Sequence, residues 1–372
     1  MMKVKLTHIL KNDVVLVVAT ALAIISMFFN APGKEYIEFI DFRVLGILLS
    51  LMLVMAGFQL NGVFKKLGEM LVRRCSNTWT LSLVLVFMCF FSSMLLTNDV
   101  ALITFVPFAL LTLKMTNMEQ IMIPVVVEQT IAANLGSMLT PMGNPQNLYL
   151  YGLSGMNIGQ FISLMLPYTI ASAVMLCIFI IFIKKKPLDL QCMEQENGRA
   201  NSLHIVLYSV MFVSCILVVL HIVEWYIVTA LIVLLMLFID RRVFKGADYN
   251  LLFTFISFFI FIGNMGQIDA VRDMLSKLIE GRELIVSVVS SQVVSNVPAA
   301  ILLSGFTDNY SALIVGTNLG GLGTLIASMA SLISYKQFSN VYSEEKGKYF
   351  RLFTVMNILF LAALLLLYVF IG

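Results

Sequence analysis

Polar residues that could bind an ion or a small solute stand inside two apolar stretches of this sequence. The first stretch contains Asn134 followed two residues later by Gly136, and the second contains Asn318 and Gly320 at the same spacing. Asparagine carboxamides both donate and accept hydrogen bonds, whereas glycine in a membrane helix weakens backbone bonding that lipid cannot replace. The recurrence of these residues predicts a binding site of the kind that transporters build where internal repeats meet.

The residues after each asparagine predict an interrupted helix. Pro141 and Pro145 lie four residues apart in the first stretch, and proline removes a backbone donor. Glycines permit the same break in the second stretch. Unwound backbone exposes carbonyl groups to a cation, and the next half-helix directs N–H groups at an anion. Close helix packing through small residues is the alternative. The candidate binding residues of the two breaks are Asn134, Gly136, Thr140, Gly143, Asn144, Asn318, Gly320, Gly321 and Thr324.

Two further polar motifs precede the breaks, and each splits an apolar region. Thr97-Asn98-Asp99 divides the region 79–113, and Ser295-Asn296 divides the region 284–306. Both arms of 284–306 are about ten residues, or roughly 15 Å of helix, which is half the hydrocarbon thickness. This predicts a re-entrant hairpin that enters from outside. Its counterpart 79–113 would enter from the cytoplasm, although its longer arms leave two full spans as an alternative.

The four motifs together predict one site at the middle of the membrane. Its candidate binding residues at the tips are Thr97, Asn98, Asp99, Ser295 and Asn296. Simple capping turns would also use Ser, Thr and Asn, but two such motifs in matching places favour a site.

Two carboxylates, Asp99 and Glu128, stand within the apolar segments of the first half. The aligned positions of the second half are Val297 and Ala312. An acid within the membrane is costly and usually marks an ion or proton pathway. We expect Asp99 to bind the coupling cation or proton, and Glu128 either to assist it or to stabilise the fold. Candidate Na⁺ sites lie near the pairs Asn98/Asn134 and Asn296/Asn318; no cofactor other than Na⁺ or H⁺ is expected.

The elements that must position these residues are transmembrane helices. The chain is 60% hydrophobic and 12% charged, with a mean hydropathy of +0.95, whereas a soluble protein carries about twice that charge. These values predict an all-α polytopic membrane protein. Segments long enough to span are 13–29, 43–61, 121–150, 160–183, 203–222, 225–240, 250–265, 310–335 and 351–371.

Basic clusters in the loops predict the orientation of these nine spans. The positive-inside rule is satisfied when the N-terminus is cytoplasmic and the C-terminus is outside. The clusters are Lys65, Lys66, Arg73 and Arg74; Lys184, Lys185 and Lys186; and Arg241, Arg242 and Lys245.

This orientation predicts two inverted-topology repeats. Segment 43–61 would run inwards and segment 250–265 outwards, as in transporters whose halves are related by an axis in the membrane plane. The first repeat is residues 1–186, with the hairpin 79–113 and the broken helix 121–150. Residues 187–202 form a polar cytoplasmic linker. The second repeat is residues 203–372, with the hairpin 284–306 and the broken helix 310–335.

The sequence gives little support for an enzyme. The three histidines, His8, His204 and His221, lie near segment ends, and the HExxH zinc motif does not occur. Five cysteines lack pairing or metal spacing. No nucleic-acid partner is expected, because the net charge is only +3 and the basic residues sit in loops that report orientation.

Four motifs resemble the ion transporter superfamily, specifically the citrate-transporter-like permeases that include arsenite pumps, sodium–proton antiporters and dicarboxylate transporters. They read LTNDVALITFVPF (Leu96–Phe108), NLGSMLTPMGNPQN (Asn134–Asn147), SNVPAAILL (Ser295–Leu303) and NLGGLGTLIASMASLI (Asn318–Ile333). The resemblance covers nearly the whole chain and is strongest to short bacterial inner-membrane permeases. It implies a homodimer whose hairpins and broken helices move as an elevator, located in the bacterial cytoplasmic membrane.

The dicarboxylate branch of this family carries Ser-Asn-Thr at both tips. This chain has Asp99 and Val297 at the third position, which removes a hydroxyl at each tip and argues against di- and tricarboxylates. The Asn-Asp step instead looks like the arsenite-pump branch.

The sequence therefore predicts a secondary active transporter of a small anion or metalloid oxyacid, coupled to H⁺ or Na⁺. A Na⁺/H⁺ antiporter and a passive ion channel are the alternatives.

Overall fold

The computed structural model describes residues 14–188 and 202–371, and within these ranges the chain is helical. One isolated β-bridge, between Asn77 and Pro187, is the sole strand-like pairing there. Five helices are long and apolar enough to cross a membrane. They are α4 (Phe42–Leu60), α7 (Asn98–Met115), α10 (Ile158–Ile181), α13 (Tyr249–Gly266) and α19 (Lys346–Ile371). The prediction of an all-α polytopic membrane protein is confirmed.

The other predicted spans are shorter or interrupted. The regions 13–29, 203–222 and 225–240 contain α2 (Val14–Ser26), α11 (Ser202–Val219) and α12 (Trp225–Ile239). The region 121–150 is divided into α8 (Met122–Ser137) and α9 (Pro145–Ser154), and the region 310–335 into α17 (Tyr310–Leu319) and α18 (Met329–Val341). Both predicted helix breaks are therefore present. Most of the predicted linker 187–202 lies outside the described residues.

The two apolar regions split by polar tips form helical hairpins. The first pairs α6 (Thr78–Ser93) with α7, and the second pairs α15 (Glu283–Val294) with the nine-residue α16 (Asn296–Ser304). Between the remaining elements run the short helices α3 (Glu35–Phe39), α5 (Val63–Val72) and α14 (Asp269–Ile279), and the 3-10 turns η1 (Glu119–Ile121), η2 (Arg241–Lys245) and η3 (Ser343–Glu345).

Polar side chains define where several of these helices begin. Asp41 accepts a hydrogen bond from the backbone N–H of Val44 at the start of α4. Asp248 accepts one from Leu251 at the start of α13. Asn77 and Asn157 cap α6 and α10 through reciprocal side-chain and backbone bonds. Such caps satisfy N–H groups that the first helical turn leaves without partners.

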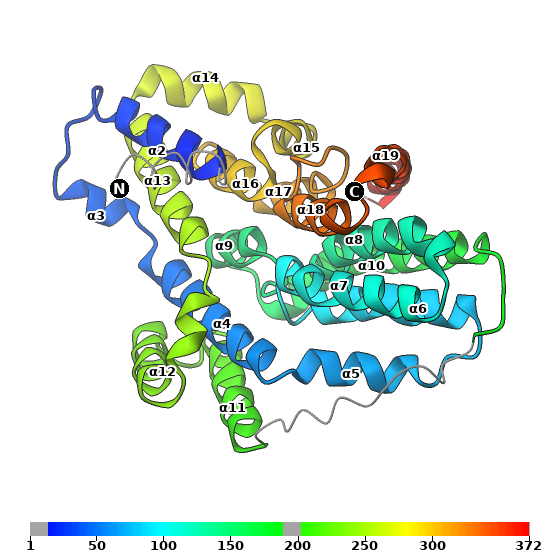
Figure 1. The fold of residues 1–372 in the computed structure, drawn as a ribbon. Coiled ribbons are helices and arrows are strands. Elements are labelled where there is room, and N and C mark those ends of the chain that lie inside the picture. The colour runs from blue at the N-terminus through cyan, green and yellow to red at the C-terminus, as the bar shows by residue number, and fades with distance from the viewer. Residues whose placement is uncertain (1–13, 189–201, 372) are drawn as a thin grey trace.

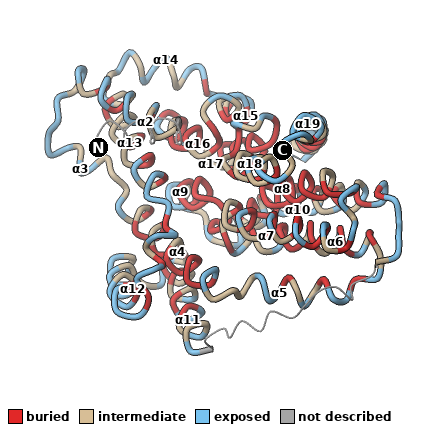
Figure 2. Tube along the Cα trace, viewed as in Figure 1, coloured by how far each residue is buried: buried red, intermediate tan, exposed pale blue. Residues whose placement is uncertain are grey.

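The helices lie in two groups around α4 (Figure 1). Helices α6, α7, α8 and α10 run side by side, whereas α2 packs on α13, and α11 and α12 pack on α4. The second part of each broken helix crosses to the other half: α9 packs against α16 and α17, and α18 packs against α7 and α8. This exchange brings both breaks and both hairpins to the interior of the molecule, where Figure 2 shows α8, α9 and α17 as mostly buried.

The first arm of the first hairpin, α6, is shorter than the neighbouring helix α10. The start of α6 lies next to the segment that follows α10. There the Thr78 N–H donates to the Lys186 carbonyl at 3.0 Å, beside the Asn77–Pro187 bridge. The 16 residues of α6 rise about 24 Å and the 24 residues of α10 about 36 Å. The last residue of α6 thus lies about 12 Å short of the level at which α10 starts, and the tip at Thr97 lies four residues further along the chain.

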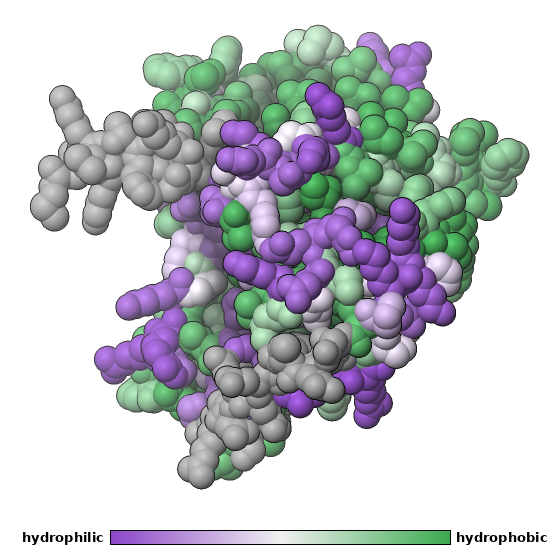
Figure 3. Space-filling model, turned by 45° about the vertical axis from the view of Figure 1, so that its right-hand side comes forward, coloured by the Kyte–Doolittle hydropathy of each residue, from purple (hydrophilic) through white to green (hydrophobic). Residues whose placement is uncertain are grey.

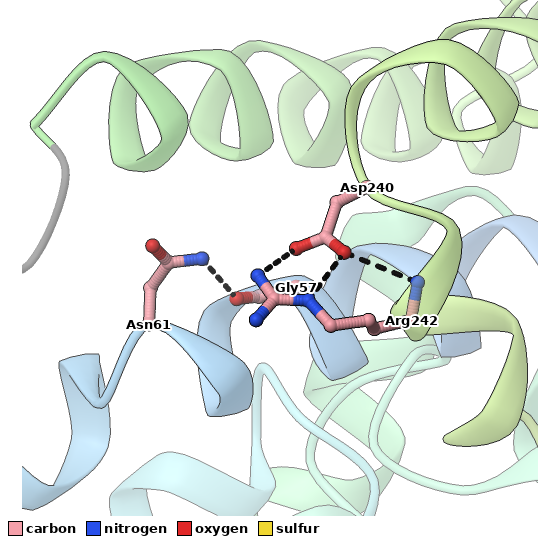
Figure 4. Close-up of polar contacts among 4 residues, drawn as sticks. All are labelled: Gly57, Asn61, Asp240 and Arg242. Atoms are coloured by element: carbon pink, nitrogen blue, oxygen red, sulfur yellow. Dashed lines mark hydrogen bonds and ion pairs between the residues drawn. The ribbon is translucent and has the colours of Figure 1, made fainter.

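The surface and one polar joint complete the fold. Figure 3 shows broad hydrophobic surface above and to the right of a band of hydrophilic residues that crosses the middle of this face. Where α4 meets η2, Arg242 Nη2 lies 2.8 Å from Asp240 Oδ2, and Asn61 Nδ2 donates to the Gly57 carbonyl at 2.9 Å (Figure 4). The hydrogen bond from Arg242 lowers the pKa of Asp240 below its ordinary value.

Candidate functional site

Both hairpin tips face one small cavity. Its volume is about 20 Å³, which is about the room that a single water molecule needs. The walls come from both halves of the chain, with further contributions from α2 and α13. Its polar lining consists of Asn98, Asp99, Asn144, Gln146, Thr254, Ser295, Asn296 and Ser328.

Four helices begin at this cavity. Asn98 opens α7, Pro145 opens α9, Asn296 opens α16 and Met329 opens α18, and all four residues line the cavity. Each helix N-terminus carries a partial positive charge and N–H groups without intrahelical partners. The convergence of four such ends makes the cavity attractive to an anion or to an electron-rich oxygen, although no Lys or Arg is among the described residues of its lining.

The first tip is fixed to the first break by its own backbone. The Asn98 N–H donates to the Gly143 carbonyl at 3.2 Å. The Asn98 carboxamide then accepts from the Asp99 N–H at 2.9 Å and donates to Asn134 Oδ1 at 2.9 Å. These bonds hold the Asp99 backbone in place and leave its carboxyl group on the cavity wall.

The second tip repeats this arrangement. The Asn296 N–H donates to the Ala327 carbonyl at 2.9 Å, and Asn296 Oδ1 accepts from the Val297 N–H at 3.0 Å. Ala327 follows Asn318 at the spacing by which Gly143 follows Asn134. The preceding residue, Ser295, has a φ of 74°, an unusual value for a residue with a side chain. The sharp reversal between α15 and α16 requires this conformation.

The threonine of each break holds the hairpin in the same way. Thr140 donates to the Met94 carbonyl, and Thr324 donates to the Gln292 carbonyl at 3.4 Å. One helical turn before Thr140, helix α8 packs closely against α6 at Gly136. A Cβ on Gly136 would lie 2.1 Å from the Phe90 carbonyl oxygen. In the second half, a Cβ on Gly320 would lie 2.6 Å from Ser291 Oγ, so its contact with the hairpin is also tight. Gly321 lies beside Asn296.

Side chains from the two halves also bond to each other. Asn134 Oδ1 accepts from Ser328 Oγ at 2.9 Å, and Asn134 Nδ2 donates to Ser331 Oγ at 3.2 Å. Asn318 Nδ2 donates to Asn147 Oδ1 at 2.6 Å. The asparagine of each first half-helix thus reaches the opposite half, and the two breaks form one polar unit.

Two buried carboxamides at the cavity have bonding capacity to spare. Asn144 is 2% exposed and Gln146 is fully buried. Neither Asn144 Oδ1 nor either polar atom of Gln146 has a hydrogen-bond partner among the described residues. Buried polar atoms without partners are costly, so these atoms are placed to bond a ligand.

The sequence patterns missed several of these groups. Gln146, Asn147, Ser328, Ser331 and Gln292 were not among the candidate residues. Gln146 directly follows the helix-starting Pro145, and that position is the signal that could have identified it.

Most candidate residues lie in or next to the cavity, and some contact only the residues around it. Thr97 lines a neighbouring small cavity together with Asn144. Thr324 is exposed, and Asn318 donates to Asn147 of the opposite half. Glu128 lies apart, in a larger cavity of about 390 Å³. Clusters of three or more metal-binding side chains are absent from the described ranges.

Comparison with known proteins gives matches along most of the chain. Residues 5–309 match the family described as citrate transporter. The chain is 32% identical over 331 residues to the inner membrane protein YbiR of Escherichia coli, which covers 84% of each chain. It is 32% identical over 258 residues to an uncharacterized transporter of Methanocaldococcus jannaschii, covering 68% of this chain and 70% of that protein. A shorter match, 29% identical over 150 residues, joins 40% of this chain to 30% of a silicon efflux transporter of Oryza sativa.

Proposed function

Because the chain belongs to the citrate transporter family, we propose that this membrane transporter is a secondary active transporter for a small anion or metalloid oxyacid. The observation that carries the proposal is the cavity at which four helix N-termini from both halves converge. Such ends bind anions and electron-rich oxygens without a fixed positive side chain. The spare carboxamide atoms of Asn144 and Gln146 would then orient the ligand.

Asp99 is the proposed coupling residue. Its carboxyl group lies on the cavity wall and would oppose an anion unless it is protonated or bound to a cation. Loading with H⁺ or Na⁺ would therefore favour substrate binding, which is the basis of symport. The Na⁺ would lie near the Asn98/Asn134 pair, and a second ion near Asn296 and the carbonyls of the second break.

Two observations support a small substrate. The cavity of about 20 Å³ is far smaller than a tricarboxylate, so citrate would require a large separation of the walls. One relative is named as a silicon efflux transporter, and silicic acid belongs to the class of small metalloid oxyacids. We infer that this chain transports a ligand of similar size.

The proposed transport movement uses the hairpins and broken helices as one body. Their backbones are joined to each other by the hydrogen bonds at both tips. Residues 1–186 and 203–372 would be the two inverted repeats. The region 79–113 would be a re-entrant hairpin, because its first arm α6 has only 16 residues. Its second arm α7 is long enough to cross, so two full spans remain the alternative. The N-terminus would be cytoplasmic and the C-terminus outside, and a homodimer would supply a fixed scaffold for an elevator movement.

A Na⁺/H⁺ antiporter is the second candidate. The small size of the cavity and its single carboxylate, Asp99, favour it. An antiporter would bind the two ions alternately at Asp99 and would need no anion.

Transport into proteoliposomes tests the proposal. The purified protein is reconstituted, a pH or Na⁺ gradient is imposed, and uptake of arsenite, silicic acid, phosphate and citrate is measured. Gradient-driven accumulation of a small oxyacid or anion is expected. Proton movement driven by Na⁺ without any of these solutes would identify the antiporter. Conductance that dissipates the gradient without accumulation would identify a channel and overturn the proposal.

A further inference from the structure

A second cavity lies near one end of α8, away from the hairpin tips. It has a volume of about 390 Å³ and lies between η1, α8, the C-terminal end of α10 and α19. Its walls are largely apolar, with Phe179, Phe182 and Met356 among them. It shares no residue with the cavity at the tips, and the proposed transport function does not use it.

Glu128 places a carboxyl group at the wall of this cavity. The residue is 2% exposed, and its Oε2 atom has no hydrogen-bond partner within the described part of the chain. A buried carboxylate without a partner is costly, more so in a membrane. The group is therefore suited to a ligand that brings a hydrogen-bonding cation.

Lys184 and Lys186 also line this cavity, and Lys186 Nζ donates to Oε1 of Gln120, another lining residue, at 3.0 Å. The segment that carries them is held extended against α6. Thr78 Oγ1 donates to the Lys184 carbonyl at 2.8 Å and accepts from the Lys186 N–H at 3.0 Å. Because side chains alternate along extended backbone, Lys185 points the other way, and its Nζ lies 5.6 Å from the centre of the Trp79 ring.

The two lysines and the carboxyl group of Glu128 indicate which chemical groups a ligand of this cavity carries. Two lysines match a phosphate, and a single carboxylate deeper along the helix matches an ammonium group that can donate hydrogen bonds. Basic pockets between membrane helices bind lipid headgroups, and Trp79 is a residue typical of the membrane interface. The exposed Phe182 beside the cavity would contact acyl chains.

We propose that this cavity binds the headgroup of a phosphatidylethanolamine-type phospholipid from the leaflet at the lysine-rich end. Lys184 and Lys186 bind its phosphate, and Glu128 accepts hydrogen bonds from its primary ammonium. The acyl chains remain in the bilayer along α10 and α19. The site would hold α8, the helix that carries Asn134, to the neighbouring α10 and α19.

Native mass spectrometry of the detergent-solubilised full chain tests this site. Phosphatidylethanolamine and phosphatidylcholine of identical acyl chains are added in turn, and the bound fraction is compared. The choline group has no N–H donor, so wild-type protein should bind phosphatidylethanolamine about tenfold more tightly. Equal binding of the two lipids, or stronger binding of phosphatidylglycerol, would overturn the proposal.

Variants separate the two halves of the headgroup. Glu128→Gln should remove the preference for ethanolamine, whereas Glu128→Asp should retain part of it. Lys184→Gln combined with Lys186→Gln should weaken the binding of both lipids. The matched control is Lys185→Gln, which should change neither, because Lys185 faces Trp79. A preference that persists in Glu128→Gln would exclude Glu128 as the ammonium partner.

Soluble phosphoethanolamine provides the last arm of the test. At the concentration of the added lipid it should fail to displace phosphatidylethanolamine, since it lacks acyl chains that contact α10 and α19. Complete displacement would show that the occupant is a water-soluble compound and would overturn the lipid assignment. Thermal unfolding of each variant, read without added lipid, checks that the variants are folded.

Discussion

The two hairpin tips share one backbone design and differ in their chemistry. Asn98 and Asn296 each donate a backbone N–H to the break that follows, and each carboxamide accepts from the next residue. The next residue is Asp99 in the first tip and Val297 in the second. The backbone bonds are therefore alike at the two tips, but only the first tip carries a carboxylate at this position.

A second difference between the halves points the same way. Gln146 follows the start of α9 and lies at the cavity, whereas the corresponding residue of α18 is the fully buried Ala330. Asp99 and Gln146, two polar groups that the matching positions of the second half lack, line the same cavity. The comparison suggests an experiment: exchanging residues between the tips separates the shared backbone bonds from the side chains that differ.

The largest loss of transport is expected when the first tip is given the residue of the second tip. Asp99→Val places the residue of one tip in the other, so the backbone should be tolerated. If Asp99 binds the coupling ion, transport should fall roughly a hundredfold or more, the scale of losing a partner of a buried charge. Gradient-driven uptake in proteoliposomes measures it.

The matching control changes the second tip. Val297→Ala adds no polar group to the cavity lining and should alter uptake by less than about threefold. Asp99→Asn should retain the fold and lose the dependence on pH or Na⁺. If Asp99→Asn transported with the dependence of the wild type, Asp99 would have no role in coupling.

The next largest effect concerns how closely each hairpin approaches its broken helix. Gly136→Ala would bring a Cβ within 2.1 Å of the Phe90 carbonyl oxygen, so α6 must move away from α8. We expect a loss of about 1–3 kcal/mol, measured by thermal unfolding. Gly320→Ala should cost less, because its closest contacts are longer, at 2.6 Å to Ser291 Oγ and 2.8 Å to both the Gly316 carbonyl oxygen and Ser291 Cβ.

Gly152→Ala is the control for these glycines. No atom lies within 4 Å of its added Cβ, so the substitution should be neutral or stabilise by up to about 1 kcal/mol. Equal losses at positions 136, 320 and 152 would mean that the two contacts are not tight.

A smaller effect is expected where the second break uses a side chain that the first lacks. Gln292 Nε2 donates to the Gly320 and Leu322 carbonyls, both at 2.9 Å, and Gln292 Oε1 accepts from the Thr324 N–H at 2.9 Å. The corresponding residue of the first half is Met94. Gln292→Met should therefore destabilise the second break by about 1 kcal/mol, seen as faster hydrogen exchange of residues 320–324. The reverse change, Met94→Gln, should leave exchange at the first break unaltered.

The sequence was sufficient to predict the breaks and tips because proline, glycine and asparagine are rare in helices facing lipid. It could not predict that α9 crosses to α16, since that contact depends on how the halves pack. Gln146 was missed because a glutamine after Pro145 is typical of any first helical turn. Only the packing of α9 shows that it lies at the cavity. Glu128 was expected near the site, but it precedes Asn134 by six residues, about 9 Å of helix, and lies in another cavity.

The smallest effect is expected outside both cavities, where α4 of the first half meets η2 of the second. Because the hydrogen bond from Arg242 lowers the pKa of Asp240 from its ordinary 3.8, the pair stabilises the fold above that pH and loses this effect as the pH falls through the lowered pKa. Asp240→Asn should lower the Tm by about a degree or less near pH 7, and by progressively less as the pH falls through the lowered pKa. Arg242→Gln should behave alike. Transport should be unchanged in both Asp240→Asn and Arg242→Gln. If either variant lost transport, the loss seen in the Asp99 variants could come from disturbed packing between the halves, and would not show what Asp99 binds.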